Sequence, residues 1–256
     1  MLITISPAKT LDENPVPKNL THSSAEMLEQ SERVIRKLRT LSHRGIKSLM
    51  NISDDLATLN QQRYQDFSPP FTPDNAKQAV MMFKGDVYKG LGAADFNKSD
   101  LAYAQKHLRI LSGLYGSLRP LDLIQPYRLE MGTKLAVGRR RDLYAFWDSH
   151  ITNSLNAAIA EQNDDVLVNL ASNEYFGAVK PKGIDARIVR PDFREERNGK
   201  YQMISFFIKK ARGLLARFII KKRLTDPGQL KAFDLEDYSY NESLSKPDKP
   251  MFTRSS

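Results

Sequence analysis

The sequence predicts a mixed α/β (α+β) protein in which helices surround one central mixed sheet. Two short apolar runs that contain β-branched residues, LITI at 2–5 and VLVNLA at 166–171, predict buried strands. The segments between and after these runs repeat their apolar residues at helical spacing. The resulting order of strand, helices, strand, hairpin and helix favours this class. We expect a single α/β domain over residues 1–235.

The first half of the chain is expected to be mainly helical after its opening strand. Helices are predicted over 23–41, 51–67, a shorter segment from 74, and 99–111. Ser53 and Ser99 are suited to cap two of these helices, because a serine hydroxyl accepts hydrogen bonds from the free amides of a first turn. The prolines from Pro69 onward end the helix over 51–67, since proline cannot donate a backbone hydrogen bond.

The second half shows its strands more clearly. A helix over 142–162 precedes the strand at 166–171. Two strand-like segments, 186–193 and 201–208, flank the pair Asn198-Gly199, which favours a tight hairpin turn. A helix over 210–223 follows, and Pro227 limits it. Residues 236–256, in which Asp, Ser, Lys and Pro are prominent, are expected to form a loosely ordered C-terminal tail.

Composition narrows the functional classes. The 256-residue chain carries 39 Lys and Arg against 30 Asp and Glu, a formal net charge of +9. This excess favours a polyanionic partner, either nucleic acid or a phosphorylated small molecule. Cysteine is absent, which excludes disulfides, iron–sulfur clusters, thiolate zinc sites and thiol-based peroxidase chemistry.

Neither a metal site nor a membrane segment is expected. The four histidines, His22, His43, His107 and His150, do not show metal-ligand spacing, so we expect no metal and no obligatory cofactor. The longest apolar runs fall short of the roughly 18 residues that a membrane span requires. The first residues lack the basic start and apolar core of a signal peptide. We therefore expect a cytoplasmic protein with no membrane partner, and the oligomeric state stays open.

Polar side chains follow both predicted buried strands. Ser6 and Lys9 come directly after the strand at 2–5, where open α/β sheets place their ligands, and they are suited to hold an anion. The alternative is a turn with Lys9 exposed. After the strand at 166–171, Glu174 is suited to acid–base chemistry or, more commonly, to capping a following helix. No catalytic triad or dinucleotide fingerprint accompanies them.

The stretch LSGLYGSLRPLDLIQPYRLEMG at 111–132 is a second candidate site. The predicted helix before it runs into Gly113 and Gly116, an arrangement that resembles a helix-hairpin-helix, whose glycine amides bind a DNA phosphate. That motif usually has one residue between its glycines, whereas two separate them here. Arg119, Arg128 and Glu130 add charged groups to the loop. The alternative is a tight glycine turn followed by a proline-braced connector.

A third candidate is the basic run KKARGLLARFIIKKR at 209–223, which has seven basic residues and no acidic one. On a helix, Lys210, Arg217 and Lys221 fall at spacings of seven and four and form one basic edge. A solvated amphipathic face is the alternative for such a run. We interpret it as a surface that follows phosphates, to which Lys209 and Arg212 also contribute.

Together these segments resemble the YaaA family of peroxide stress-response proteins over nearly the whole chain. The matching stretches are ISPAKTL (5–11), FKGDVY (83–88), LSGLYGSLRPLDLIQPYRLEMG (111–132), DLYAFW (142–147), NLASNEYF (169–176) and KKARGLLARFII (209–220). The resemblance implies a cytoplasmic protein that protects cells from hydrogen peroxide by limiting unincorporated iron. It also implies an unusual fold with a basic cleft, binding of double-stranded DNA, and a helix-hairpin-helix-like element, here around 108–120. It brings no settled enzymatic activity.

Two functions follow from these observations. The first is a protective protein that binds double-stranded DNA. Its expected contacts are Lys9, Arg109, Gly113, Gly116, Arg119, Arg128, Lys209, Lys210, Arg212, Arg217 and Lys221. The alternative is an enzyme acting on a nucleotide-like or other anionic small molecule, with Ser6, Lys9, Glu130 and Glu174 as its catalytic candidates. The first is our prediction. Direct iron binding has little support, because only scattered carboxylates remain as ligands.

Overall fold

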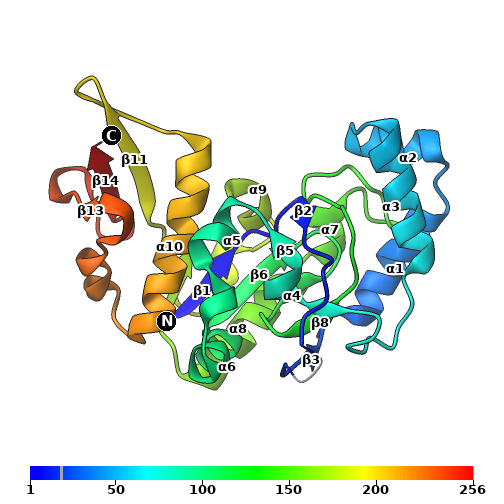
Figure 1. The fold of residues 1–256 in the computed structure, drawn as a ribbon, viewed down its shortest axis with the longest axis horizontal. Coiled ribbons are helices and arrows are strands. Elements are labelled where there is room, and N and C mark those ends of the chain that lie inside the picture. The colour runs from blue at the N-terminus through cyan, green and yellow to red at the C-terminus, as the bar shows by residue number, and fades with distance from the viewer. Residues whose placement is uncertain (18–19, 256) are drawn as a thin grey trace.

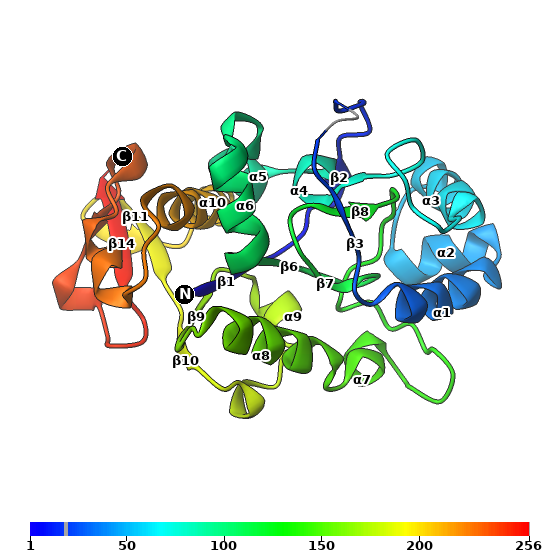
Figure 2. The same cartoon turned by 90° about the horizontal axis from the view of Figure 1, so that it is seen from below.

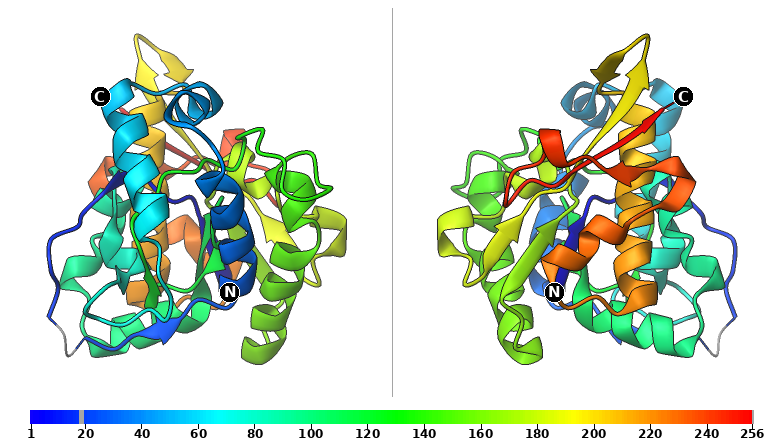
Figure 3. Two further views of the ribbon diagram at one scale, coloured as in Figure 1. Left: turned by 90° about the vertical axis from the view of Figure 1, so that its right-hand side faces the viewer. Right: turned by 90° about the vertical axis from the view of Figure 1, so that its left-hand side faces the viewer.

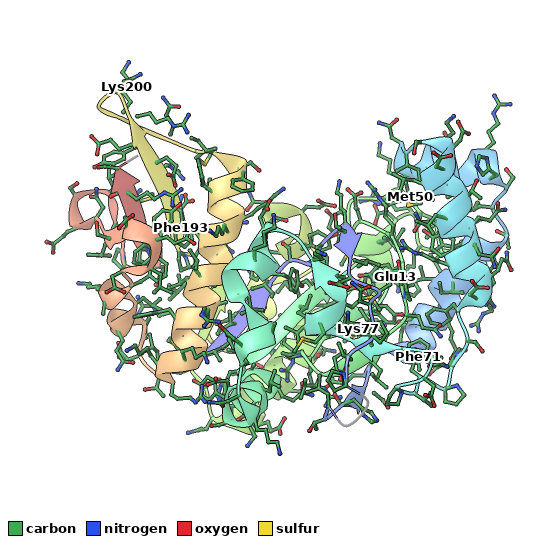
Figure 4. All side chains as sticks on the ribbon, viewed as in Figure 1. Glu13, Met50, Phe71, Lys77, Phe193 and Lys200 are labelled. Carbon is green, nitrogen blue, oxygen red and sulfur yellow. The ribbon has the colours of Figure 1, made fainter. Side chains whose placement is uncertain are left out.

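The computed structural model describes residues 1–17 and 20–255. Its outline is elongated, with a projection at each end of a central α/β part (Figure 1). Lys200 lies at the tip of one projection and Met50 lies on the other (Figure 4). No helix in the described part of the chain is long and apolar enough to cross a membrane.

The central sheet contains both strands that the sequence predicts as buried. Its strand order is β10 (Arg187–Val189), β9 (Val166–Asn169), β1 (Leu2–Ile5), β6 (Leu108–Ser112) and β7 (Gly116–Leu118). The first four strands are parallel to their neighbours, and β7 runs antiparallel to β6. The register places Ile3 opposite both Leu108 and Val168. The prediction of a mixed sheet among helices is confirmed.

Ten α-helices are assigned in the described residues. They are α1 (Leu28–Arg39), α2 (His43–Met50), α3 (Asp54–Asp66), α4 (Ala79–Met82), α5 (Asp86–Leu91), α6 (Lys98–His107), α7 (Leu143–Trp147), α8 (His150–Gln162), α9 (Asn173–Phe176) and α10 (Ser205–Lys222). Figure 2 shows α5, α6 and α10 on one side of the central strands and α8 on the other. The predicted helix over 142–162 is two helices, because Asp148 adopts a positive φ of 44° between α7 and α8.

Short strands and 3₁₀ turns complete the frame. The strands are β2 (Thr10–Leu11), β3 (Ser23–Ser24), β4 (Lys77–Gln78), β5 (Phe83–Lys84) and β8 (Asp122–Ile124). The turns are η1 (Ala93–Asp95), η2 (Pro181–Gly183), η3 (Pro227–Ala232), η4 (Leu235–Asp237) and η5 (Glu242–Leu244). β2 pairs with β5, and β8 lies between β3 and β4.

Helix α10 is a core element that packs closely against α5. A Cβ atom added to Gly213 would lie 1.9 Å from the backbone oxygen of Val87, and one added to Gly90 would lie 2.2 Å from that of Lys210. Both glycines are therefore needed for the approach of the two backbones. Leu215 and Ile219, on the same helix, are fully buried. The basic run at 209–223 thus belongs to a helix with one face in the core.

A second sheet corrects the expectation of a loosely ordered tail over 236–256. Its order is β12 (Lys200–Gln202), β11 (Asp192–Arg197), β14 (Met251–Ser255) and β13 (Ser239–Tyr240), so two of its four strands come from that segment. Phe252 in β14 is fully buried and stacks on Phe193 of β11 at 5.6 Å between ring centroids. The right-hand view of Figure 3 shows these strands beside α10. The polar average composition of the tail masks this apolar anchor.

The strands predicted over 186–193 and 201–208 are only partly correct, because β11 runs over Asp192–Arg197 and residues 205–208 already belong to α10. The turn predicted between them at Asn198-Gly199 is confirmed. It joins β11 to β12, and both turn residues have positive φ, 52° and 71°. These values are those of a turn whose twist suits antiparallel strands.

The structure also corrects the helix-hairpin-helix-like element expected around 108–120. α6 ends at His107, and the chain continues as β6 and β7, an antiparallel pair. Gly113 begins the buried turn of this β-hairpin and Gly116 is the first residue of β7, and the indole nitrogen of Trp147 donates to the oxygen of Gly113 at 3.0 Å. The apolar run LRIL pairs beside β1, so its burial in the sheet overrides the helical pattern before it. A helix–turn–helix does occur in the chain, between α2 and α3.

Candidate functional site

The carboxyl ends of β1 and β9 meet at one edge of the central sheet. Ser6 follows β1 and Ser172 lies three residues after β9, and Ser6 Oγ accepts a hydrogen bond from the Ser172 amide at 2.9 Å. The chain leaves β1 for β6 on one side and leaves β9 for β10 on the other. Ligands of open α/β sheets bind where the strand order reverses in this way.

A cavity of about 400 Å³ opens at this edge. It is bordered by the loop after β1, the start of α5, the start of α9 and one face of α10. Its polar lining includes Ser6, Lys9, Tyr88, Glu174, Lys209 and Arg212. The two polar loops that follow the predicted strands therefore converge, and basic residues from the run at 209–223 join them.

Glu130 lies between two cations beside this cavity. Lys9 Nζ is 2.7 Å from Glu130 Oε2, and Arg128 Nη2 is 3.3 Å from Glu130 Oε1. Glu174 Oε1 accepts a hydrogen bond from the Gly132 amide at 3.0 Å, which holds α9 against the loop that contains Glu130. The segment 111–132 thus reaches the site through its last residues rather than through its glycine turn.

Two buried tyrosines, Tyr88 and Tyr175, lie beside the cavity. The Tyr88 hydroxyl donates to the backbone oxygen of Ser6 at 3.1 Å. Burial raises the pKa of Tyr88 well above its ordinary value, and it raises the pKa of Tyr175 too, to which Tyr127 and the Glu174 and Glu130 carboxylates add. Both phenols are neutral at physiological pH, and the Tyr88 hydroxyl acts as a hydrogen-bond donor that fixes the loop after β1.

Comparison with known families decides the relationship. Residues 1–244 match the family model described as peroxide stress protein YaaA. The chain belongs to this family. The match covers all the elements described above except β14, and it extends into the second sheet that the C-terminal residues help to form.

Several residues that the sequence assigns to DNA are structural in this YaaA protein. Arg109 is buried, and its guanidinium donates to the backbone oxygens of Gln105 and Lys106 at the end of α6 and of Leu108 at the start of β6. Arg119 forms an ion pair with Asp122, which is fully buried. Arg128 forms an ion pair with Glu130, and Gly113 and Gly116 are buried.

Five of the six cations of α10 fall into two groups, and Lys222 at the end of the helix lies outside both. Lys210, Arg217 and Lys221 form ion pairs with acidic residues from elsewhere in the chain. The pairs are Lys210 with Glu236, Arg217 with Asp95 at 2.6 Å, and Lys221 with Asp100 at 2.6 Å. Within the described residues, neither Lys209 nor Arg212 has a carboxylate at ion-pair distance. The group that lines the cavity is thus the unpaired one.

The α2–α3 hairpin forms a further surface depression, which no motif in the sequence had indicated. This depression is lined by His43, Arg44, Lys47, Ser48, Asn51, Ile52 and Asp54. The available signal was a pair of serines, Ser42 and Ser53, each of which caps a helix. The sequence predicts a helix over 51–67 but none over 43–50, so it did not predict a pair of helices here.

No group of three or more His, Cys, Asp or Glu side chains suited to a metal ion occurs among residues 1–17 and 20–255. The partly buried histidine His107 pairs within the protein. It lies 3.3 Å from Asp164 and stacks on Tyr103.

Proposed function

We propose that this YaaA protein binds double-stranded DNA through the turn between α2 and α3, and that this binding protects DNA during peroxide stress. The observation that carries the proposal is a compact helix–turn–helix whose turn presents backbone amides. Three residues, Asn51, Ile52 and Ser53, join the two helices, and Asn51 adopts the left-handed conformation with φ 49°.

The amides at the start of α3 are available to a phosphate. Ser53 Oγ accepts from the Leu56 amide at 3.4 Å, and the Ala57 amide donates to the Ser53 backbone oxygen. In the described structure, the amides of Ser53, Asp54 and Asp55 have no hydrogen-bond acceptor. Free amides at a helix N-terminus bind phosphate oxygens without reading the base sequence.

An unpaired cation beside the turn supports the same partner, although Asp54 and Asp55 bring negative charge to the first turn of α3. Arg44 is exposed and has no ion-pair partner among the residues that the structure describes, while Lys47 is paired with Asp54. The formal net charge of +9 attracts polyanions over a longer range. Contacts of this kind give affinity for any duplex, with a strong dependence on salt.

A matched pair of substitutions at Asp54 tests the amide contact. Proline suits the first position of a helix, and the extended Ser53 before it, with ψ 165°, accommodates a following proline. Asp54→Ala and Asp54→Pro both remove the carboxylate, but only the second removes the N–H group. We expect Asp54→Ala to bind a duplex at least as tightly as wild type and Asp54→Pro to bind about fivefold to tenfold more weakly than Asp54→Ala. Equal affinities of the two variants would contradict the proposal.

The role in the cell is proposed from family membership. We propose a cytoplasmic protein that lowers unincorporated iron as well as binding DNA. Chelatable iron, measured in peroxide-stressed cells with and without the protein, should be lower when the protein is present. Equal iron levels in the two strains would remove this part of the proposal and leave the DNA contact untouched.

A further inference from the structure

Arg212 on α10 is a largely buried cation without a partner. Its Nε atom is buried and has no hydrogen-bond acceptor, and none of its nitrogens forms a hydrogen bond or an ion pair in the described structure. The nearest opposing charge, Asp192, is already paired with Arg194 at 3.0 Å and with Lys249 at 3.3 Å. The guanidinium of Arg212 therefore lacks a counterion within the protein.

Other arginines with a buried Nε differ from Arg212 in this respect. Among the described residues, Arg63, Arg109 and Arg128 also have a buried Nε without an acceptor. Each of these three uses another nitrogen to reach a carboxylate or backbone oxygens: Glu13 for Arg63, the end of α6 for Arg109, and Glu130 for Arg128. Arg212 has no such second contact, so its side chain is not explained by the fold.

An uncompensated buried charge is strongly destabilising, because removal from water is not repaid by a partner. Burial accordingly lowers the pKa of Arg212, although arginine stays protonated at physiological pH. A buried polar group without a partner in a native structure calls for an explanation, and a bound anion that supplies the missing partner is one. Arg212 faces space that a ligand can fill, since it lines two adjacent cavities.

The two cavities differ in character. The cavity of about 400 Å³ at the sheet edge presents Lys209 and Ser6 together with Arg212. Lys209 stands one helical turn from Arg212 and is likewise unpaired in the described residues, so the two cations lie on one face of α10. The second cavity, of about 810 Å³, is lined by charged side chains such as Arg190 and Lys249 as well as by amide and apolar ones such as Asn169, Ile188 and Met203.

We propose that Arg212 and Lys209 bind the phosphate group of a small phosphate ester, and that the organic part of the ester occupies the second cavity. A guanidinium matches two phosphate oxygens at once, and a phosphomonoester carries a charge of about −1.5 to −2 at pH 7, which suits two cations. The Ser6 hydroxyl accepts from Ser172 and keeps its own proton for a third oxygen. This site is separate from the α2–α3 turn and extends beyond DNA binding.

Calorimetric titration of the full-length protein with inorganic phosphate tests the site. We expect saturable binding to wild type, and binding roughly tenfold or more weaker to Arg212→Met, because two charge-assisted hydrogen bonds are lost. Methionine keeps an apolar stem of similar length in the packed helix. Lys209→Gln, at an exposed position that tolerates substitution, should weaken phosphate binding by several-fold. This variant provides a second test of the site if Arg212→Met does not fold. Lys222→Gln removes one charge from an exposed position of α10 outside both cavities and should bind like wild type.

Absence of phosphate binding to the wild type, or equal binding to wild type and the Arg212 and Lys209 variants, would overturn the proposal. Duplex affinity of the same variants identifies the source of the phosphate. We expect Arg212→Met to keep the duplex affinity of wild type. Parallel loss of phosphate and duplex binding would mean that the anion is a nucleic-acid phosphate, and the small-ester site would be wrong. Equal duplex binding by Asp54→Ala and Asp54→Pro would count against the DNA proposal alone.

Discussion

Ser6 Oγ accepts a hydrogen bond from the Ser172 amide at 2.9 Å, although the two residues are 166 positions apart in the chain. This contact ties the loop after β1 to the loop after β9 at the edge where the cavity opens. The cavity therefore depends on long-range strand pairing, and its shape is fixed by the same residues that are available to a ligand.

Replacement of Ser6 by alanine should destabilise the protein. Ser6→Ala leaves the partly buried Ser172 amide without its acceptor, which costs about 1–3 kcal/mol of unfolding free energy. Lys9→Ala, three residues along the same loop, is the control. Lys9 is 59% exposed, and its ion pair with Glu130 should contribute only about 0–1 kcal/mol. Urea unfolding measures both, and a larger loss for Lys9→Ala than for Ser6→Ala would contradict this ranking.

The C-terminal strand should contribute strongly to stability. Phe252 is fully buried against Phe193, so Phe252→Ala should cost about 3–5 kcal/mol through lost burial and the cavity that remains. Leu244→Ala removes a side chain that is 40% exposed in the same C-terminal segment and should cost much less. Equal unfolding midpoints for the two variants would show that β14 does not anchor the second sheet.

Asp100 should make stability depend on pH in the acid range. The hydrogen bond from Lys221 is the largest influence on Asp100. Together with the hydrogen bond from Arg223 it outweighs the effect of burial and lowers the pKa of Asp100 below its ordinary value of 3.8. The stabilisation is therefore present above pH 3.8 and is lost as the pH falls through the lower folded-state pKa. Asp100→Asn should be less stable than wild type at neutral pH, and the difference should shrink below pH 3.8. A difference that stays constant from neutral to acid pH would contradict this assignment.

The purified protein should not consume hydrogen peroxide catalytically. The chain has no cysteine, and its eight methionines are oxidised stoichiometrically rather than in a cycle. A peroxide electrode trace with metal-free protein should match the trace of buffer after an initial stoichiometric loss at most. Sustained turnover under those conditions would show that the protein reduces peroxide itself, contrary to this prediction.

The parts of the fold that were predictable are those with local signals. The apolar run at 2–5 predicts a strand and the pair Asn198-Gly199 predicts a turn, and the structure contains both. The position of β1 between β6 and β9 is a long-range pairing, so no local pattern contains it. Two glycines at this spacing, Gly113 and Gly116, fit a β-hairpin as well as a helical hairpin. Only the long-range pairing of β6 with β1 distinguishes the two structures.

The candidate site follows the same division. Ser6, Lys9 and Glu174 were predictable because they follow buried strands, and the structure brings them to one cavity. The basic run at 209–223 was interpreted as a phosphate surface because it contains no acid. Its counterions, Asp95, Asp100 and Glu236, come from elsewhere in the chain, so sequence spacing does not reveal the pairing.

We propose that double-stranded DNA is bound at the α2–α3 turn rather than along α10. The salt dependence of duplex affinity tests it most directly, because each phosphate contact contributes a slope of roughly −0.9 in log–log form. We expect Arg44→Gln to make the slope shallower by about 0.9, since Arg44 is unpaired. The triple variant of Lys210, Arg217 and Lys221 to glutamine should keep the wild-type slope, because those cations already have partners. A slope unchanged in Arg44→Gln and shallower by about two to three units in the triple variant would contradict the account.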